Sequence, residues 1–442
     1  AKIMKQLSSP SAPLSTADLY EIYKSFPQVQ TDTRQLKKGD LYFALKGPNF
    51  NGNEFALQAL EQGAAYSIVD EAVDASAHLQ ERIIYVADVL SSLQALAKFH
   101  REQFNIPFIA ITGSNGKTTT KELVAAVLSS HYRIYTTKGN LNNHIGVPLT
   151  LLSIKQDAQF AIIEMGANHL KEIESYCSYT LPTHGMITNC GKAHLEGFGS
   201  EEGVRKGKGE LFEYLKTHQG TVFLMQDFDY LVKMAQGIPH IIGYGTEHGQ
   251  IQGDTIDQNG MLTVQINKGI DINSIQTHLV GNYNLPNVLA AVAIGQHFKV
   301  PNDKIKLAIE NYIPTNSRSQ LLTWNKNEVI LDAYNANPSS MKLAVENFAK
   351  MNKENKIVCL GGMRELGADT LMEHQMLIDQ LTQTNWKQVL LVGSEFKSCI
   401  HNFLYFDTVL EAKAWIQAQE LKGYTILIKG SRGIQMEQLI AP

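Results

Sequence analysis

Short apolar runs recur along the chain, separated by polar turns and by segments whose apolar positions have helical spacing. Beyond residue 104 these runs read FIAIT, FAIIE, GMIT and TVFLM, and each has the length of a buried strand. In the segment that follows the first run, one helical face collects Leu123, Val124, Val127 and Leu128. Strands that alternate with helices predict a doubly wound, mainly parallel sheet.

The same rhythm divides the chain into three blocks. Residues 1–103 carry LYFALKG, YSIVD and RIIYV, which predict a small α/β domain. Residues 104–314 form a central domain, in which the alternating stretch 240–280 predicts an antiparallel excursion. Residues 315–442 start a new series of EVILD, KIVCL, QVLLV and YTILI, with Pro314 as the expected hinge. We therefore expect an α/β protein of three domains.

Composition narrows the class of protein. A chain of 442 residues is too long to fold around a single hydrophobic core, so several domains are expected. Its content of 44% apolar and 19% charged residues is ordinary for a globular enzyme. A net charge of −4 does not favour nucleic acid as a partner. We expect no membrane span, because no long apolar run occurs, and no secretion signal in the first 15 residues. The four cysteines are widely separated, which indicates reduced thiols in a cytoplasmic protein rather than disulfides or a zinc site.

A glycine turn with one lysine joins the FIAIT run to the next helix. Small residues from Gly113 to Gly116 let backbone N–H groups point at an anion, and the helix N-terminus adds its dipole. Lys117 adds a positive charge for phosphate, and the Thr118 hydroxyl can ligate Mg²⁺. The loop is shorter than the usual phosphate loop, because Ile111 stands where a glycine is expected. The alternative is a plain glycine turn into a helix.

Two later strands end in side chains that suit a metal or a phosphate. Glu164 closes the FAIIE run, and the carboxyl ends of strands border the ligand crevice of such a sheet. We expect Glu164 to face Thr118 across one Mg²⁺, although a glutamate in solvent is the alternative. The GMIT run delivers Asn189 and His194 to the same edge, where His194 could ligate a metal or contact phosphate. A lone histidine is otherwise usually structural.

Two further polar segments allow two interpretations each. The segment 136–152 is rich in side-chain amides, which suit a polar, anionic substrate or form a simple turn cluster. Lys206 and Lys208 precede a helical pattern. One interpretation is that both lysines lie on a solvated basic face. The other is that one of them, in its neutral form and near magnesium ions, adds CO₂ and becomes an anionic carbamate ligand.

Several motifs together resemble the Mur ligases, which add amino acids to the UDP-linked muramic acid precursor of peptidoglycan. The resemblance covers nearly the whole chain and includes ITGSNGKTTTK (111–121), GNLNNHIGVPLTLL (139–152), IIEMGANHLKEI (162–173) and KGSRGIQME (429–437). YNANP (334–338) and MRELG (363–367) resemble the branch that joins D-alanyl-D-alanine to UDP-N-acetylmuramoyl tripeptide. Rival interpretations are another ATP-dependent amide ligase, a nucleotide switch or motor, and a binding protein without catalysis.

The resemblance implies a fold and a mechanism. It implies an N-terminal domain for the UDP substrate, a central ATPase domain and a C-terminal Rossmann-like domain. ATP and two Mg²⁺ ions would convert the tripeptide carboxylate into an acyl phosphate, which D-alanyl-D-alanine then attacks. The third residue of the tripeptide, diaminopimelate or lysine, stays open, and we expect a monomer.

The resemblance also assigns roles to individual residues. Contacts to uridine and diphosphate fall to Thr31, Asp32, Thr33, Arg34, Lys46 and Gly47. Contacts to ATP fall to Gly113, Ser114, Asn115, Gly116, Lys117, Thr118, Thr119, Asn284, Asn287, Arg318, Asp332, Tyr334 and Asn335. The metal shell would be Thr118, Glu164, His194 and Lys208, the last as a carbamate with Lys206 as the alternative. Catalysis would depend on Lys117, His194, Lys208 and Arg318. The tripeptide would be positioned by Asn140, Asn142 and Asn143, and the dipeptide carboxylate would be bound by either Arg432 or Arg364.

Overall fold

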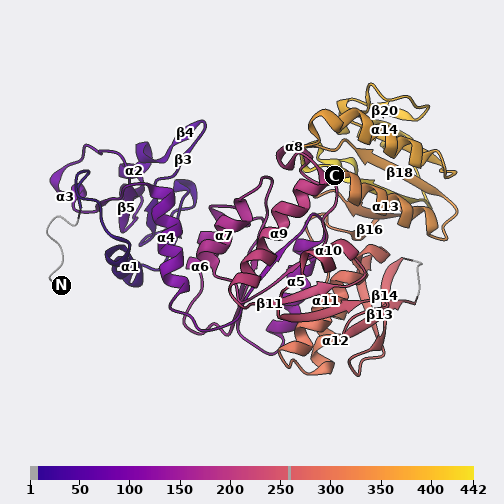
Figure 1. Ribbon diagram of the computed structural model, residues 1–442. Coiled ribbons are helices and arrows are strands. Elements are labelled where there is room, and N and C mark those ends of the chain that lie inside the picture. The colour runs from indigo at the N-terminus through magenta and orange to yellow at the C-terminus, as the bar shows by residue number, and fades with distance from the viewer. Residues whose placement is uncertain (1–7, 257–259) are drawn as a thin grey trace. The chain divides into compact units, whose positions relative to one another are not determined.

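The computed structural model describes residues 8–256 and 260–442. The start of the N-terminal segment considered above, residues 1–7, and residues 257–259 of the alternating stretch lie outside this description. The chain forms two compact units (Figure 1). The first comprises residues 1–110, 133–165 and 174–183, and the second comprises 111–132, 166–173 and 184–442. Within the described residues, no helix has the length and apolar character needed to cross a membrane.

Three larger sheets confirm the predicted α/β class and its three-domain organisation. The compact units do not follow the limits at residues 103 and 314, because the boundary between the units runs through the central segment. Those domain limits therefore stay a prediction. Each unit is described below by itself.

The N-terminal sheet has four parallel strands in the order β1-β2-β5-β6. Its strands are β1 (Val29–Gln30), β2 (Leu41–Phe43), β5 (Tyr66–Val69) and β6 (Ile83–Tyr85). Its helices are α1 (Thr16–Ser25), α2 (Ala56–Glu61), α3 (Ala77–Gln80) and α4 (Val89–Arg101), with short 3₁₀ turns at Thr33–Gln35 and Gly52–Phe55. A small separate hairpin pairs β3 (Lys46–Gly47) with β4 (Phe50–Asn51). Every residue of β2, β5 and β6 is buried, as expected for strands covered on both faces.

The central sheet has nine strands in the order β15-β14-β13-β12-β11-β10-β7-β9-β8. They are β7 (Phe108–Thr112), β8 (Ile134–Thr136), β9 (Phe160–Glu164), β10 (His184–Ile187), β11 (Thr221–Met225), β12 (His240–Gly245), β13 (Ile251–Thr255), β14 (Met261–Lys268) and β15 (Ser274–Val280). The predicted antiparallel segment is confirmed for β13, β14 and β15, which pair antiparallel in sequence. Strand β12 lies in the same predicted segment but pairs in parallel with both its neighbours.

The central helices follow the strand-helix rhythm that the sequence indicated. They are α5 (Lys117–Ser129), α6 (Gly146–Leu152), α7 (Glu172–Thr180), α8 (Leu195–Phe198), α9 (Glu201–Thr217), α10 (Asp229–Met234), α11 (Leu285–His297) and α12 (Asn302–Asn311), with a 3₁₀ turn at Asn282–Asn284. The predicted apolar face of α5 is fully buried. Helices α5, α11 and α12 lie next to one another (Figure 1). They pack closely at Gly295 of α11, where an added Cβ would lie 2.6 Å from Val127 of α5 and 3.0 Å from Ile305 of α12.

The C-terminal sheet has six strands in the order β16-β17-β21-β18-β19-β20. They are β16 (Gln320–Trp324), β17 (Asn327–Asp332), β18 (Lys356–Gly361), β19 (Gln388–Val392), β20 (Leu404–Phe406) and β21 (Thr425–Lys429). Its helices are α13 (Pro338–Lys350), α14 (Thr370–Leu381) and α15 (Val409–Ala418), with 3₁₀ turns at Gly367–Asp369, Ser394–Phe396, Arg432–Ile434 and Met436–Ile440. Only β16 is antiparallel to its neighbour, so β17, β21 and β18 end at one edge of the sheet. Asp332 and Lys429 are register partners at that edge.

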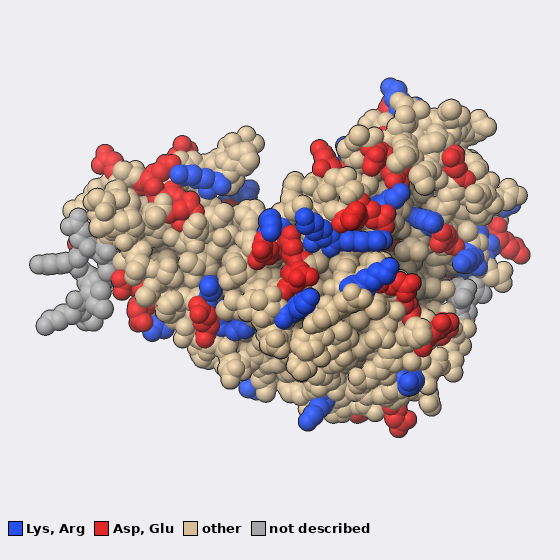
Figure 2. All heavy atoms as spheres, viewed as in Figure 1, with Lys and Arg blue, Asp and Glu red and all other residues tan. Residues whose placement is uncertain are grey.

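Charged side chains of both signs are interspersed over the visible face of each unit (Figure 2). Where several Lys and Arg side chains lie close together on that face, acidic side chains lie next to them (Figure 2).

Candidate functional site

The glycine turn between β7 and α5 has the backbone geometry that a phosphate loop needs. Gly113 has a φ of 149° and Gly116 a φ of 79°, in the region that side chains rarely adopt. A Cβ on Gly113 would lie 1.8 Å from Thr188 Oγ1, so the loop passes too close to its neighbour for any other residue. Lys117 and Thr118 occupy the first two positions of α5, where the helix dipole favours an anion.

Asn189 braces this loop from the end of β10. Its Oδ1 accepts from the Asn115 N–H at 3.0 Å, and its Nδ2 donates to the Asn115 carbonyl at 3.0 Å. Its backbone carbonyl accepts from the Ser114 N–H at 2.9 Å, and the Thr188 hydroxyl donates to the Asn115 carbonyl at 2.6 Å. The loop conformation is therefore held by neighbouring protein groups. The sequence placed Asn189 at this edge but did not indicate that it would support the loop.

Asn284 and Asn287 lie beside the start of α5. Both are buried, and the Thr120 hydroxyl donates to Asn287 Oδ1 at 3.0 Å. Asn287 Nδ2 donates to Asn284 Oδ1 at 3.0 Å, and Asn284 Nδ2 donates to the Val280 carbonyl at 2.9 Å. These amides connect β15 and α11 to the first turn of α5. Their expected contact with adenine stays a prediction.

The YNANP turn reaches the phosphate loop within the second unit. As predicted, Asn337 caps α13 and Pro338 is its first residue, with a reciprocal bond to Ser340. Asn337 Nδ2 donates to Asn115 Oδ1 at 2.7 Å, and the Lys192 N–H donates to Ser339 Oγ at 2.7 Å. The C-terminal sheet edge and the phosphate loop are therefore neighbours in this unit.

A further contact joins the loop after β10 to α14. Lys192 Nζ lies 2.9 Å from Glu373 Oε1, whose side chain is buried in the first turn of α14. The hydrogen bond to Glu373 raises the pKa of Lys192 above its ordinary value. The sequence did not single out either residue.

Two of the nominated arginines lie against the ring of Tyr334. The guanidinium carbon of Arg318 lies 3.5 Å from the centroid of the Tyr334 ring, and that of Arg432 lies 5.1 Å from it. Arg432 Nη1 also donates to the Tyr334 hydroxyl at 3.3 Å. Two cations that the resemblance assigned to different substrates therefore share one aromatic ring.

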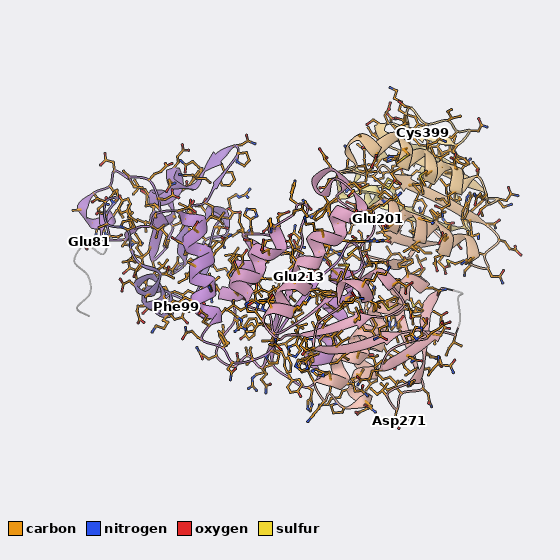
Figure 3. All side chains as sticks on the ribbon, viewed as in Figure 1. Glu81, Phe99, Glu201, Glu213, Asp271 and Cys399 are labelled. Carbon is orange, nitrogen blue, oxygen red and sulfur yellow. The ribbon has the colours of Figure 1, made fainter. Side chains whose placement is uncertain are left out.

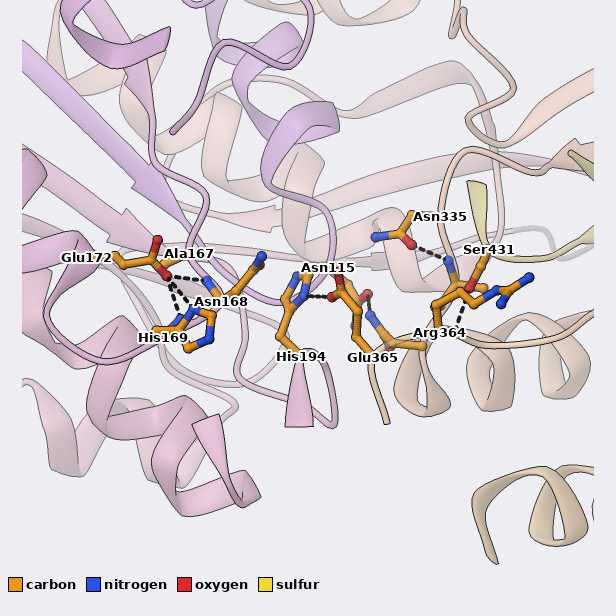
Figure 4. Close-up of polar contacts among 12 residues, drawn as sticks. Asn115, Ala167, Asn168, His169, Glu172, His194, Asn335, Arg364, Glu365 and Ser431 are labelled. Atoms are coloured by element: carbon orange, nitrogen blue, oxygen red, sulfur yellow. Dashed lines mark hydrogen bonds and ion pairs between the residues drawn. The ribbon is translucent and has the colours of Figure 1, made fainter. Parts of the chain in front are cut away.

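Asp332 has a partner that the sequence did not reveal. Lys429 Nζ lies 2.9 Å from Asp332 Oδ2 and donates to the Asn335 carbonyl at 3.3 Å. The Lys429 side chain is only 4% exposed, so its charge is directed into this turn and not into solvent. Asn335 itself is exposed, and its Oδ1 accepts from the Ala336 N–H at 2.9 Å (Figure 4).

The MRELG segment contributes two charged contacts. Glu365 Oε2 is paired with His194 Nδ1 (Figure 4), and this contact lowers the pKa of Glu365 below its usual value. Arg364 Nε lies 3.1 Å from Glu395 Oε1, and the Arg364 N–H donates to Ser431 Oγ at 2.9 Å. The Arg364 guanidinium thus already has a carboxylate partner in the protein.

The two candidate lysines of α9 differ in environment. This helix runs from Glu201 past Glu213, both labelled in Figure 3. Lys206 is exposed, which fits the solvated basic face. Lys208 is 1% exposed, and its Nζ donates to the Ala167 carbonyl at 3.1 Å and lies 5.5 Å from the Phe198 ring centroid. The tertiary structure therefore separates the two lysines that the sequence left as alternatives.

In the first unit, Glu164 ends β9 and is buried, so the alternative of a glutamate in solvent is wrong. Asn142 Nδ2 donates to Glu164 Oε2 at 2.5 Å, and the Glu164 N–H donates to Thr137 Oγ1 at 2.9 Å. Asn143 Oδ1 accepts from the Gly146 N–H at 2.8 Å at the start of α6, which is the turn role that the sequence left open. Asn140 is exposed.

The predicted UDP-binding residues also lie in the first unit. Asp32 caps the turn at Thr33–Gln35 and pairs with Arg34, whose Nη2 lies 2.9 Å from Asp32 Oδ2. Hydrogen bonds from Arg34 lower the pKa of Asp32 below its usual value. Thr31 donates its N–H to Gln30 Oε1 at 3.0 Å.

The hairpin of β3 and β4 holds the remaining nominated pair. Lys46 Nζ lies 2.9 Å from Glu71 Oε1 and 3.1 Å from Asp70 Oδ1, which raises the pKa of Lys46. Gly47 lies against the Phe50 ring, which would contact an added Cβ at this position. Tyr42 donates its hydroxyl to the Gly52 carbonyl at 2.9 Å beside this hairpin.

The nominated metal ligands are a threonine hydroxyl, a carboxylate, an imidazole and a modified lysine. Across residues 8–256 and 260–442, no group of three or more His, Cys, Asp and Glu side chains is close enough to hold a metal ion. The oxygen donors of this set, the threonine hydroxyl and the carboxylate, fit Mg²⁺, which keeps several waters and is bound through one or two carboxylates together with substrate phosphates. A buried Glu164 is one carboxylate of that kind.

Comparison with known protein families gives three adjoining matches. Residues 26–101 match the Mur ligase family, catalytic domain; residues 111–295 match the Mur ligase middle domain; and residues 317–432 match the Mur ligase, glutamate ligase domain. Together these matches account for most of the chain and follow the order of the three sheets.

Individual proteins are similar over nearly the same length. The UDP-N-acetylmuramoyl-tripeptide–D-alanyl-D-alanine ligase of Bacillus subtilis is 33% identical, over 93% of this chain and 92% of its own. The ligase of that name from Escherichia coli is also 33% identical, with the same coverage of each chain. Among solved structures, a crystal structure of MurF from Acinetobacter baumannii has a TM-score of 0.85 and 30% identity, and covers 93% of this chain and 92% of that chain.

Proposed function

The chain belongs to the Mur ligase family, and from this premise we propose that it joins D-alanyl-D-alanine to UDP-N-acetylmuramoyl tripeptide at the expense of ATP. The reaction belongs to the synthesis of peptidoglycan precursors, and we assign it to the cytoplasm and to a monomer. The observation that carries the proposal is the glycine loop, with Lys117 at the start of α5, lying beside the YNANP turn.

The chemistry follows from the low reactivity of a carboxylate toward an amine. A carboxylate oxygen of the tripeptide attacks the γ-phosphorus of ATP, ADP leaves, and an acyl phosphate forms. The uncharged amino group of D-alanyl-D-alanine then attacks the acyl carbon. The tetrahedral intermediate collapses, inorganic phosphate leaves, and the proton of the amine passes to solvent. When bound, Mg²⁺ supplies charge neutralisation on the phosphates.

The protein contributes binding and charge. The phosphate loop and the dipole of α5 hold the phosphates of ATP, and Lys117 stabilises the transferred phosphoryl group. Arg318, resting on Tyr334, supplies a second cation for the γ-phosphate, and Asp332 accepts from the ribose hydroxyls. Thr118, Glu164 and His194 are the proposed residues for Mg²⁺.

Substrate recognition is divided among the remaining residues. The Thr31–Arg34 turn and the hairpin at Lys46 and Gly47 bind the uridine diphosphate portion, and Asn140, Asn142 and Asn143 position the tripeptide. Arg432 is the better candidate for the dipeptide carboxylate, because Arg364 is engaged by Glu395. The proposed domains are residues 1–103 for the UDP substrate, residues 104–314 for ATP and residues 315–442 for the Rossmann-like domain.

Substituting Lys117 with alanine tests the proposal. Loss of one charge on the transition state should lower kcat by about 10²–10³-fold. The measurement is phosphate release from ATP in the presence of UDP-N-acetylmuramoyl tripeptide, with and without D-alanyl-D-alanine. Lys233→Ala, at an exposed position on α10, is the matched control and should remain fully active.

Two results would contradict the proposal. Retained activity in Lys117→Ala would remove the loop from the site. Phosphate release by the wild-type chain that ignores D-alanyl-D-alanine would indicate a switch or a motor instead of a ligase.

Lys208 is the proposed carbamylated lysine, because it is buried whereas Lys206 is exposed. Lys208→Ala should abolish ligation, and a short-chain carboxylic acid added to the assay should restore part of it by replacing the carbamate. Lys206→Ala is the matched control and should keep its activity. Intact activity of Lys208→Ala, or the same loss and rescue in Lys206→Ala, would refute this assignment.

A further inference from the structure

The MRELG segment docks on the loop that follows β10, within the second unit. His194 has a φ of 52° and Glu365 a φ of 62°, so two residues with side chains adopt the left-handed conformation where the loops meet. Such residues are uncommon, and they persist where the surrounding structure holds them. Here the two loops hold each other.

Two contacts define the docking. Glu365 Oε2 is paired with His194 Nδ1, and the Glu365 carbonyl accepts from the Glu196 N–H at 3.1 Å. Gly367, two residues further on, has a φ of 56°, and a Cβ there would lie 3.6 Å from the Glu196 side chain. The backbone bond holds Glu365 beside the loop that carries His194, whose Nδ1 its carboxylate contacts. Figure 4 shows the His194 ring directed at this carboxylate.

The pairing has a chemical consequence for the imidazole. An ionised carboxylate can only accept a hydrogen bond, so Nδ1 of His194 must carry a proton. In the neutral ring the other nitrogen, Nε2, then presents a lone pair. Carboxylate partners of this kind commonly orient histidines that bind a metal, and they set both the tautomer and the direction of the ring.

We propose that Glu365 is a positioning residue, which holds His194 as the Nδ1–H tautomer so that Nε2 is available to a cation at the phosphate site. The inference rests on the proposed function, since it deepens the role assigned to His194. It also makes the site depend on the C-terminal domain, because that domain supplies the carboxylate. A simple surface ion pair is the competing explanation, and it would leave the tautomer undetermined and contribute little.

Nitrogen NMR on the full-length chain tests the tautomer directly. The histidines are labelled with ¹⁵N, and the signals of His194 are identified by their loss in His194→Gln. In the wild-type chain at pH 8, Nδ1 should show the shift of a protonated nitrogen and Nε2 that of an unprotonated one. In Glu365→Gln, whose amide can donate as well as accept, this preference should be lost. Asp369→Asn removes the same charge from the same loop and should leave the His194 signals unchanged.

A binding measurement adds a second readout. Calorimetry of ADP binding at increasing Mg²⁺ concentration should show that Glu365→Gln needs about 10–100-fold more Mg²⁺, the usual effect of removing such a partner. Glu365→Asp, which keeps the carboxylate, should recover part of the wild-type behaviour. Circular dichroism establishes that each variant is folded, which is expected because the Glu365 side chain is 50% exposed.

Three results would overturn the inference. These are an unchanged tautomer in Glu365→Gln, a wild-type His194 with protons on both nitrogens, and an equal effect in Asp369→Asn. Failure of the proposed function is distinguishable, because Lys117→Ala should lower the kcat of ligation about 10²–10³-fold without altering the His194 signals. If the wild-type chain shows the expected tautomer but does not ligate, the positioning role of Glu365 is supported and the proposed function is wrong.

Discussion

Two aspartates that are each expected to contact a nucleotide have very different surroundings. Asp332 ends β17 and pairs with Lys429, while Asp32 follows β1 and pairs with Arg34. The nitrogen–oxygen distance is 2.9 Å in both pairs. The side chains of Lys429 and Asp332 are 4% and 15% exposed, whereas those of Arg34 and Asp32 are 88% and 26% exposed.

Ion pairs with the same nitrogen–oxygen distance can therefore contribute very different free energies to folding, depending on how far they are buried. Removing one partner of a buried pair leaves a charge that neither water nor protein compensates. An exposed pair contributes little to stability, because water and salt screen it. We therefore expect Lys429 to maintain the fold and the Asp332–Asn335 turn, whereas Arg34 stays accessible to an anionic substrate.

Lys429→Met should have the largest effect on stability. It removes a buried cation from Asp332 and from the Asn335 carbonyl, which should cost about 3–5 kcal/mol. The measurement is the first thermal transition of the full chain, followed by circular dichroism. Lys422→Met, at an exposed position near the same strand, is the control and should not shift it. A Lys429→Met variant as stable as the wild type would show that the pair is not buried in solution.

The double variant Lys429→Met with Asp332→Leu sharpens the comparison. Removing both charges should restore most of the stability lost in the single variant, because no buried charge is left without a partner. ATP binding should not recover, since the proposed ribose acceptor is gone. The dissociation constant for ATP, measured by calorimetry, should rise about 10–100-fold, as expected for a lost hydrogen bond to a charged group. Recovery of both properties would exclude Asp332 from the nucleotide site.

Arg34→Gln should have the smallest effect on stability and a moderate effect on binding. The thermal transition should stay where it is, because the Arg34 side chain is almost fully in solvent. The KM for the UDP-linked substrate should rise about tenfold, since one charge-assisted contact to phosphate is lost, while the KM for ATP should not change. Lys38→Gln, a nearby exposed position, is the control. An increase in both KM values would indicate a general defect instead of a lost contact.

Much of the local structure could be predicted from the sequence. The strand before the phosphate loop, the helix after it, and Asn337 as the cap of α13 are all confirmed. Each of these depends on residues close together in the chain, where spacing and capping chemistry decide the conformation. The Asp32–Arg34 pair is local in the same way, since two positions separate its members.

The side-chain partners were much harder to predict. Lys429 was missed because it lies 97 positions from Asp332, and only the register of β17 against β21 brings them together. Asn189 was recognised as a strand-end residue but not as the support of the phosphate loop. Lys206 and Lys208 are two positions apart on one helix, so their spacing could not decide which of them is buried.

The sequence by itself determined the α/β class, the glycine turn before α5 and the family, because periodicity, glycine positions and contiguous motifs are properties of short segments. The tertiary structure alone decided which charges are buried and which polar groups pair. It put Lys429 on Asp332, Glu365 on His194 and Asn337 on Asn115. The physical reason is that burial and long-range hydrogen bonding depend on how separate strands and helices pack, and residues far apart in the chain carry no local sign of that contact.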